Sequence, residues 1–401
     1  MKSFHTAFSF APPSILSLTI CTCYDNHNYG SMLQAYATYV KFVELGYDCE
    51  FLCYRKKLNT IQKIKWLPRL LNKYLMKEKF RLIEKKIQLK KHPDIKMKDA
   101  IRQRAFDRFL ENFLKDKVSA PYIGFEALRA GSKNYDVVVA GGDQLWIPAG
   151  LPTNFFNLMF ADEKVKRVSY STSFGVTEVP FYQKRRTIEY LNRIEMLGVR
   201  EKSGAELIER LTGRKAVVVL DPTLLLNKEE WAQAIPVKPV LENDYIFCYF
   251  LGANSEHRKV AEELSKKTGI PLYDMPHIDE FVPYDLQFNA KHLYDIDSEQ
   301  FVNLIRYAKY ICTDSFHCTV FSILHHKQFL AFDRYSDPLM MSRNSRIANL
   351  CDITGLSSRR YTGDVLEQMK KPIDYDRVDE RLEKEKAISV AYIREALGKN
   401  D

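Results

Sequence analysis

The sequence predicts an α/β fold of two doubly wound, Rossmann-like domains that face each other across a cleft. At 401 residues the chain is too long for one ordinary hydrophobic core. Short apolar runs alternate with segments of helical periodicity, in one series that begins near residue 15 and a second that begins near residue 196. We therefore expect an N-terminal domain over residues 1–195, a second domain over 196–335, and a helical segment over 336–401 that packs back on them.

The first predicted unit is a strand, a polar loop, a helix and a second strand. The apolar run Ile15–Thr22 breaks at the loop Tyr24–Gly30, and apolar residues at helical spacing follow it. Ser31 can cap the start of this helix, and Gly46 ends it. The loop carries one glycine instead of the GxGxxG pattern, so the dinucleotide-binding fingerprint is absent. Asn26, Asn28 and Tyr29 of this loop either hydrogen-bond a polyhydroxylated ligand or form the turn.

Two later strands also end in polar residues. The run Tyr135–Trp146 is typical of a buried strand that enters a Gly-Gly turn, where Gly141 and Gly142 allow close backbone approach. Asp143 then faces the crevice. The strand Arg167–Gly175 ends in small hydroxylated residues as well. Because the carboxyl ends of parallel strands lie at one edge of a sheet, these residues predict a shared polar mouth.

The stretch from Lys309 to Phe332 has the strongest pattern in the second domain. It predicts a buried strand, a polar turn, a helix over about residues 316–326 and another strand. Asp314 or Ser315 is suited to cap that helix, and His317 lies in its first turn. A helix N-terminus at the edge of a parallel sheet suits a small anion. The alternative is that His317 is only a polar residue on the shoulder of the helix.

The positive charge of the chain is concentrated in one segment. Residues 55–117 contain 21 Lys and Arg against 7 Asp and Glu, whereas the whole chain carries a formal charge of +9. Apolar residues there keep a helical period, which predicts a basic helical insertion over about residues 60–117. This segment is either a solvated helix pair that covers the sheet or a contact with an anionic membrane surface or glycan. No nucleic-acid-binding module accompanies it, so we expect no nucleic-acid partner.

The start of the chain and its cysteines indicate a cytoplasmic protein. We interpret Ile15–Cys21 as the first strand instead of a signal peptide, because a Pro-Pro pair precedes it and no clear cleavage site follows. The eight cysteines lie in apolar contexts without CxxC or zinc-site spacing, as expected for thiols in a reducing compartment. No apolar run approaches the roughly 18 residues that a membrane span needs.

Five short stretches that are spread over most of the chain stand in a recognisable order. They are NYGSMLQAYA (28–37), AGGDQLW (140–146), VREKSGAEL (199–207), VVLDPTLLL (218–226) and TDSFHCTVFSIL (313–324). Together they resemble the polysaccharide pyruvyl transferase family. The resemblance implies a glycosyltransferase-B-like fold and transfer of a pyruvyl group from phosphoenolpyruvate onto two hydroxyls of a sugar. That reaction forms a cyclic ketal and releases phosphate.

The resemblance also implies roles for individual residues. Arg200 and His317 match the family's arginine and histidine, and they are the catalytic candidates. Arg200 would hold the phosphate or carboxylate of the donor, and His317 would act as general acid. Members of the family commonly carry an arginine where this chain has Ser315, so Arg343 or Arg346 would supply the missing charge. The predicted substrate-binding set is Asn28, Tyr29, Gly30, Gly141, Gly142, Asp143, Ser315 and Arg346.

Other expectations concern partners and rival functions. Asn28 and Asp143 are assigned to the acceptor side, and Asp221 is predicted to be structural. No cofactor or metal is expected, and the acceptor would be a glycan or lipid-linked oligosaccharide at the inner face of the membrane. The two alternatives are a nucleotide-sugar glycosyltransferase of the same fold and a non-catalytic glycan- or membrane-binding protein.

Overall fold

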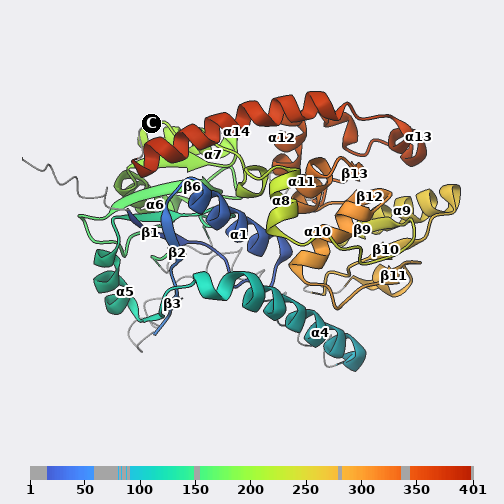
Figure 1. Ribbon diagram of the computed structural model, residues 1–401, viewed down its shortest axis with the longest axis horizontal. Coiled ribbons are helices and arrows are strands. Elements are labelled where there is room, and N and C mark those ends of the chain that lie inside the picture. The colour runs from blue at the N-terminus through green and yellow to red at the C-terminus, as the bar shows by residue number, and fades with distance from the viewer. Residues whose placement is uncertain are drawn as a thin grey trace, which may run out of the picture.

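Two parallel sheets organise the protein, as the computed structural model shows (Figure 1). The structure describes residues 16–57, 80, 83, 87, 91–148, 154–278, 282–335 and 344–398. The first sheet has six strands and the second has five, and each lies in its own lobe. This arrangement confirms the predicted α/β fold with two Rossmann-like halves.

The first sheet has the strand order β2-β1-β5-β6-β7-β8, and all its pairs are parallel. The chain changes direction across the sheet between β1 and β5, which creates a topological switch point. Its strands are β1 (Ser17–Cys21), β2 (Asp48–Phe51), β5 (Val137–Ala140), β6 (Lys166–Thr172), β7 (Met196–Val199) and β8 (Val217–Val218).

The second sheet has the order β11-β10-β9-β12-β13, and it is also parallel. Its switch point lies between β9 and β12. The strands are β9 (Ile246–Tyr249), β10 (Leu272–Asp274), β11 (Lys291–His292), β12 (Tyr310–Thr313) and β13 (Gln328–Ala331). A separate parallel pair consists of β3 (Tyr54–Arg55) and β4 (Tyr122–Ile123).

The change from one sheet to the other occurs later in the chain than the sequence suggested. The prediction assigned β7 and β8 to a second domain from residue 196. Instead, β7 pairs with β6 and β8 pairs with β7, so both belong to the first sheet. The strand and helix alternation continues unbroken through this region, so periodicity alone could not show which sheet a strand joins. The second sheet begins only with β9, after the proline-containing link Ile235–Val240.

Helices cover the sheets and connect the lobes. The α-helices are α1 (Tyr29–Glu44), α4 (Pro93–Phe109), α5 (Phe125–Gly131), α6 (Phe181–Arg193), α7 (Lys202–Thr212), α8 (Lys228–Ala234), α9 (Ser255–Thr268), α10 (Ser298–Tyr307), α11 (Phe316–Leu324), α12 (Ser345–Thr354), α13 (Val365–Lys370) and α14 (Tyr375–Leu397). The shorter turns are the π-helix η2 (Leu110–Leu114) and the 3-10 helices η3 (Lys115–Lys117), η4 (Ser132–Asn134), η6 (Pro222–Leu224), η7 (Pro283–Leu286) and η9 (Ser357–Arg359).

Helix α1 starts earlier than predicted. The expected cap, Ser31, lies inside the helix, and the Asn28 side chain instead accepts a hydrogen bond from the Ser31 backbone N–H. Asparagine is as good a cap as serine, so the sequence offered two starts three residues apart. The earlier start places Tyr29 and Gly30 in the first turn of α1, at the boundary between the lobes.

One hydrophobic core runs through both lobes. Helix α1 of the first lobe contacts α10 and α11 of the second. Tyr29 joins them directly, because its ring stacks on Phe301 at 5.0 Å and its hydroxyl donates to the carbonyl of Ile296. A rigid contact of this kind fixes the two sheet edges relative to each other.

The final helix returns to the first lobe, as the sequence predicted for the C-terminal segment. Figure 1 shows α14 (red) running along the molecule from one lobe to the other. The Tyr392 hydroxyl donates to the Ser169 carbonyl of β6, and the Leu220 N–H donates to Ser389 Oγ. A Cβ at Gly198 would lie 2.6 Å from the Tyr392 ring, so this contact requires glycine.

The described part of the basic insertion packs against the loop that precedes α1. Helix α4 places Phe106 against the His27 ring at 5.4 Å, and its Arg108 pairs with Asp295 of the second lobe at 2.6 Å. Most of residues 58–90 of the predicted insertion lies outside the described residues. Among those described, no helix is both long enough and apolar enough to cross a bilayer.

Candidate functional site

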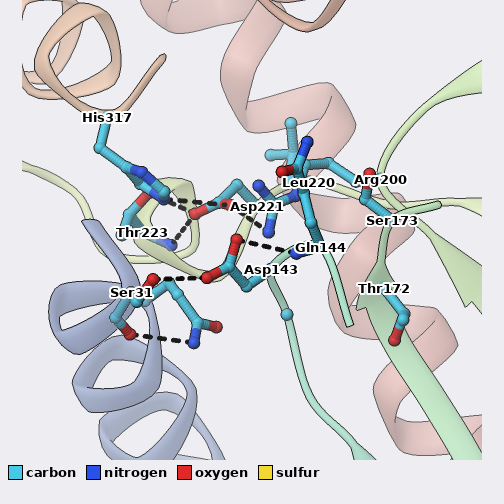
Figure 2. Close-up of polar contacts among 12 residues, drawn as sticks. Ser31, Asp143, Gln144, Thr172, Ser173, Arg200, Leu220, Asp221, Thr223 and His317 are labelled. Carbon is cyan, nitrogen blue, oxygen red and sulfur yellow. Dashed lines mark hydrogen bonds and ion pairs between the residues drawn. The ribbon is translucent and has the colours of Figure 1, made fainter. Parts of the chain in front are cut away.

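The carboxylate of Asp221 joins residues from both lobes. Asp221 follows β8 and accepts hydrogen bonds from the backbone N–H and hydroxyl of Thr223, which hold the side chain in place. Its Oδ2 lies 3.0 Å from Arg200 Nη2 and 3.7 Å from His317 Nε2 (Figure 2). Arg200 and His317 therefore meet at one buried carboxylate, although they come from different sheets.

Arg200 presents unused hydrogen-bond donors in a buried setting. It follows β7, and its side chain is only 4% exposed. None of its three guanidinium nitrogens makes a hydrogen bond with good geometry among the described residues, despite the short distance to Asp221. Buried polar groups are usually paired, so an arginine in this state is a candidate for holding an anionic ligand.

His317 lies in the first turn of α11, where the sequence placed it. Ser315 caps this helix and accepts from the Cys318 N–H, which confirms one of the two predicted caps. The His317 ring rests on the first turn of α1, because a Cβ at Gly30 would lie 2.0 Å from His317 Nδ1. Gly30 thus serves the imidazole by leaving room for it.

The positive groups keep two acids of the site ionised. Burial alone would raise the pKa of Asp221, but Arg200 and His317 outweigh it and hold that pKa below its usual range. The pKa of Asp143 is lowered in the same way: burial opposes the shift, and Arg200 and then His317 overcome it. Both side chains therefore remain negative at neutral pH.

Asp143 has an uncommon backbone conformation. Its φ angle is 82°, which a residue with a side chain rarely adopts. The structure holds it there through a hydrogen bond from Ser31 Oγ to Oδ2 at 2.5 Å and one from the Gln144 N–H to Oδ1 at 2.8 Å. Such positions cost about 1–3 kcal/mol and gather at functional sites. Asp143 is thus a fixed, half-buried carboxylate beside Arg200 and His317.

A second arginine reaches the site from α12. The Arg346 guanidinium lies 5.8 Å from the centre of the Phe316 ring, and the Arg200 guanidinium lies 5.4 Å from the same ring. Burial, together with Arg334 and Arg200, lowers the pKa of Arg346 to about 10. Arg346 therefore still carries its charge at neutral pH.

Arg200, Asp221 and Arg346 lie on the wall of a partly open pocket, whose lining does not include His317 or Asp143. Arg200, Asp221 and Arg346 supply charge, and Phe316 supplies a ring face. Much of the remaining wall is aliphatic, from the end of β8 and from α12. A pocket with a few convergent polar groups on an apolar wall is typical of a small-molecule site.

Several predicted ligand residues have structural tasks instead. Asn28 caps α1, and Tyr29 is buried between the lobes. A Cβ at Gly141 would lie 3.1 Å from the Ile20 side chain. A Cβ at Gly142 would lie 2.6 Å from Gln34 Oε1. Contacts within the protein account for both glycines.

Two residues of the site were not among those predicted to bind substrate or take part in catalysis. Asp221, which it predicted to be structural, contacts Arg200 and neighbours His317. Glu201 was not singled out, yet it lines the pocket. Their positions in the sequence could have indicated a role at the site, since both residues follow strand ends at the carboxyl edge of the first sheet. Of the two arginines proposed to replace the one missing at Ser315, Arg346 is at the site, and Arg343 lies outside the described residues.

The described residues include no cluster of three or more His, Cys, Asp or Glu side chains that could hold a metal ion. The described site offers two arginines, one imidazole and several carboxylates.

Comparison with known families identifies the chain. The family model described as polysaccharide pyruvyl transferase matches residues 28–336. The chain belongs to the polysaccharide pyruvyl transferase family. The matched range contains every strand of the two sheets except β1, and it contains Arg200, Asp221 and His317, whereas Arg346 lies beyond it. Comparison with curated proteins finds no match.

Solved structures show the fold that this family member shares. A proposed UDP-N-acetylglucosamine 2-epimerase from Listeria monocytogenes has 11% identity and a TM-score of 0.50, with 96% of this chain and 97% of that chain covered. The UDP-GlcNAc 2-epimerase from Neisseria meningitidis, bound to UDP-GlcNAc, has 12% identity and a TM-score of 0.49, with 96% and 100% covered. An α-glucosyltransferase in complex with UDP has 8% identity and a TM-score of 0.46, with 94% and 95% covered. At 11% identity the likeness to the Listeria protein concerns the fold alone, which is glycosyltransferase-B-like with two Rossmann-like lobes.

The contact between Gly30 and His317 can be tested by adding one methyl group. We expect Gly30→Ala to displace the His317 ring and to lower the melting temperature, because the new Cβ has no room. Gly204→Ala on α7 is the control, since its nearest neighbours are 3.7 Å away and alanine favours helix. A Gly30→Ala protein as stable as the control variant would contradict this packing.

Proposed function

We propose that this family member transfers the pyruvyl group of phosphoenolpyruvate to two hydroxyls of a sugar in a polysaccharide or its precursor. The proposal rests above all on Arg200, a buried guanidinium whose donors are unused among the described residues and which lies beside His317. The carboxylate of phosphoenolpyruvate is planar and its phosphate is tetrahedral. Both are oxyanions that the planar guanidinium of an arginine can bind through two hydrogen bonds.

The second arginine supports a donor with several negative charges. Arg346 is near Phe316, the residue after Ser315, and so compensates for the arginine that the family commonly has at that position. Arg200 and Arg346 each approach the Phe316 ring, which keeps two like charges close to one pocket. Two guanidinium groups beside one pocket favour an anionic ligand over a neutral one.

His317 is the proposed proton donor. In the reaction a proton must reach the methylene carbon of the enol phosphate, so that the neighbouring carbon can accept a sugar hydroxyl. The Asp221 carboxylate lies 3.7 Å from His317 Nε2 and can orient the ring toward a bound donor. Phosphate then leaves, and the second hydroxyl closes the ketal.

A nucleotide-sugar glycosyltransferase is the second candidate, and the second sheet argues against it. In doubly wound sheets a diphosphate usually sits on the backbone amides of the first strand-to-helix turn. Here the N–H groups of Leu251 and Gly252, after β9, donate to the Asp314 carboxylate at 2.6 and 2.8 Å. Asp314 also pairs with Arg334. A diphosphate would have to displace this internal carboxylate.

The catalytic roles can be tested with two variants. We expect His317→Asn to reduce phosphoenolpyruvate-dependent phosphate release by roughly 10²- to 10⁴-fold, as for loss of a general acid. Arg200→Lys keeps the charge but loses the fork, so it should raise KM for phosphoenolpyruvate by about tenfold or more. His326→Asn is the control, because this histidine pairs with Asp379 on the surface at 3.0 Å. Near wild-type turnover by His317→Asn would remove His317 from the mechanism.

The donor can be identified by thermal shift. We expect phosphoenolpyruvate to raise the melting temperature, and UDP-sugars to have no effect, because the turn after β9 is already filled by Asp314. At 100 times its Kd a ligand stabilises the folded state by about 2.7 kcal/mol. Stabilisation by a UDP-sugar alone would favour the glycosyltransferase alternative.

We also propose that the basic segment holds the protein against an anionic membrane surface, where a lipid-linked acceptor would be found. Phe80, Ile83 and Ile87 are helical and are 62%, 53% and 46% exposed. They recur at helical spacing within a sequence rich in Lys and Arg. A basic helix with an exposed apolar stripe suits the lipid interface.

Vesicle flotation tests this contact. We expect the wild type to float with anionic vesicles more than with neutral ones, and less as salt rises. The triple variant Phe80→Ser, Ile83→Ser and Ile87→Ser should lose binding, whereas Ile388→Ser, an exposed isoleucine on α14, should retain it. Equal flotation of the wild type with both kinds of vesicle would argue against an electrostatic membrane contact.

A further inference from the structure

Glu201 is a buried carboxyl group in the pocket that the proposed reaction has not yet used. It immediately follows Arg200 and is 6% exposed. Its Oε1 accepts a hydrogen bond from Ser173 Oγ at 2.6 Å, and its Oε2 has no hydrogen-bond partner among the described residues. One oxygen is therefore held in place while the other is available.

The side chain does not perform the task that its position in the chain suggests. Glu201 is the N-cap residue of α7, yet its carboxylate makes no capping hydrogen bond. Instead it lines the same pocket as Arg200, Asp221 and Arg346. The Glu201 side chain therefore points into the pocket instead of capping the helix that it precedes.

We propose that Glu201 is the base that accepts the proton of the first sugar hydroxyl. This role rests on the proposed pyruvyl transfer. The hydroxyl oxygen bonds to the phosphate-bearing carbon, and its proton moves to Glu201 Oε2. The methylene carbon takes a proton from His317. The bond from carbon to the phosphate oxygen then breaks, and the second hydroxyl adds as its proton leaves with phosphate. Glu201 returns its proton to His317 before the next cycle, so atoms and charges balance without another reactant.

The charges around the site separate Glu201 from the other acids. Burial raises the pKa of Glu201, and Ser173 and Arg200 offset this only in part. The pKa of Asp221 and that of Asp143 are both lowered. A carboxylate of higher pKa is the stronger base, and groups whose pKa values are driven apart commonly divide the acid and base roles. Asp143, which the sequence suggested for the acceptor side, is the weaker base.

Ser173 allows the role of Glu201 to be tested without removing the carboxylate. The Ser173 hydroxyl donates to Oε1 and so favours the ionised form. Ser173→Ala should raise the pKa of Glu201 further. The acidic limb of kcat/KM for phosphate release, measured from pH 4 to 9, should then move to higher pH. A purely structural role would lower activity equally at every pH.

Glu201→Gln tests the same role directly. We expect phosphate release to fall by roughly 10²- to 10⁴-fold. The pH profile of kcat/KM should lose the acidic limb that Glu201 causes. Phosphoenolpyruvate should still raise the melting temperature. Glu209→Gln, an exposed acid on the same helix, should match the wild type.

The outcomes distinguish this role from the reaction itself. An active wild type with a fully active Glu201→Gln variant would overturn the role of Glu201 alone. An unchanged acidic limb in Ser173→Ala would also overturn it, even if Glu201→Gln fails to fold. A wild type that releases no phosphate from phosphoenolpyruvate with any acceptor glycan would overturn the proposed function and this role with it.

Discussion

The ion pair between Arg200 and Asp221 is the interaction on which the site depends. Taking a guanidinium out of water is costly unless a carboxylate compensates it, and Asp221 provides that carboxylate at 3.0 Å. The compensation is incomplete, since the arginine donors have no well-aligned hydrogen bonds among the described residues. The fold thus maintains a buried cation that is paired well enough to be stable and still able to bind an oxyanion.

The Asp221 carboxylate lies close to residues from both lobes, so the site forms where the two lobes meet. Asp221 and Arg200 belong to the first sheet, whereas His317 begins a helix of the second. The close fit of His317 against Gly30 and the aromatic contact of Tyr29 with Phe301 keep the two edges in register. Small changes at this boundary would move the imidazole relative to the arginine, so residues with purely packing roles also support the chemistry.

Local patterns allowed much of the fold to be predicted from the sequence. The strand, turn and helix predicted after Lys309 are β12, the turn that follows it and α11. Long-range pairing was less accessible. Nothing in the spacing of Met196–Val199 indicates which sheet it joins, and Asp221 looks like a turn residue until Arg200 and His317 are placed beside it. Likewise, the close approach that Gly142 permits is to Gln34 within the protein, which no local pattern could distinguish from a ligand.

The proposed reaction requires that the pocket beside Asp221 binds phosphoenolpyruvate. A crystal structure of the protein soaked with phosphoenolpyruvate tests it most directly. We expect the phosphate or carboxylate oxygens to lie within hydrogen-bond distance of the Arg200 guanidinium, with the ligand also near Arg346 and His317. Phosphoenolpyruvate bound instead at the turn after β9, in place of the Asp314 carboxylate, would contradict it.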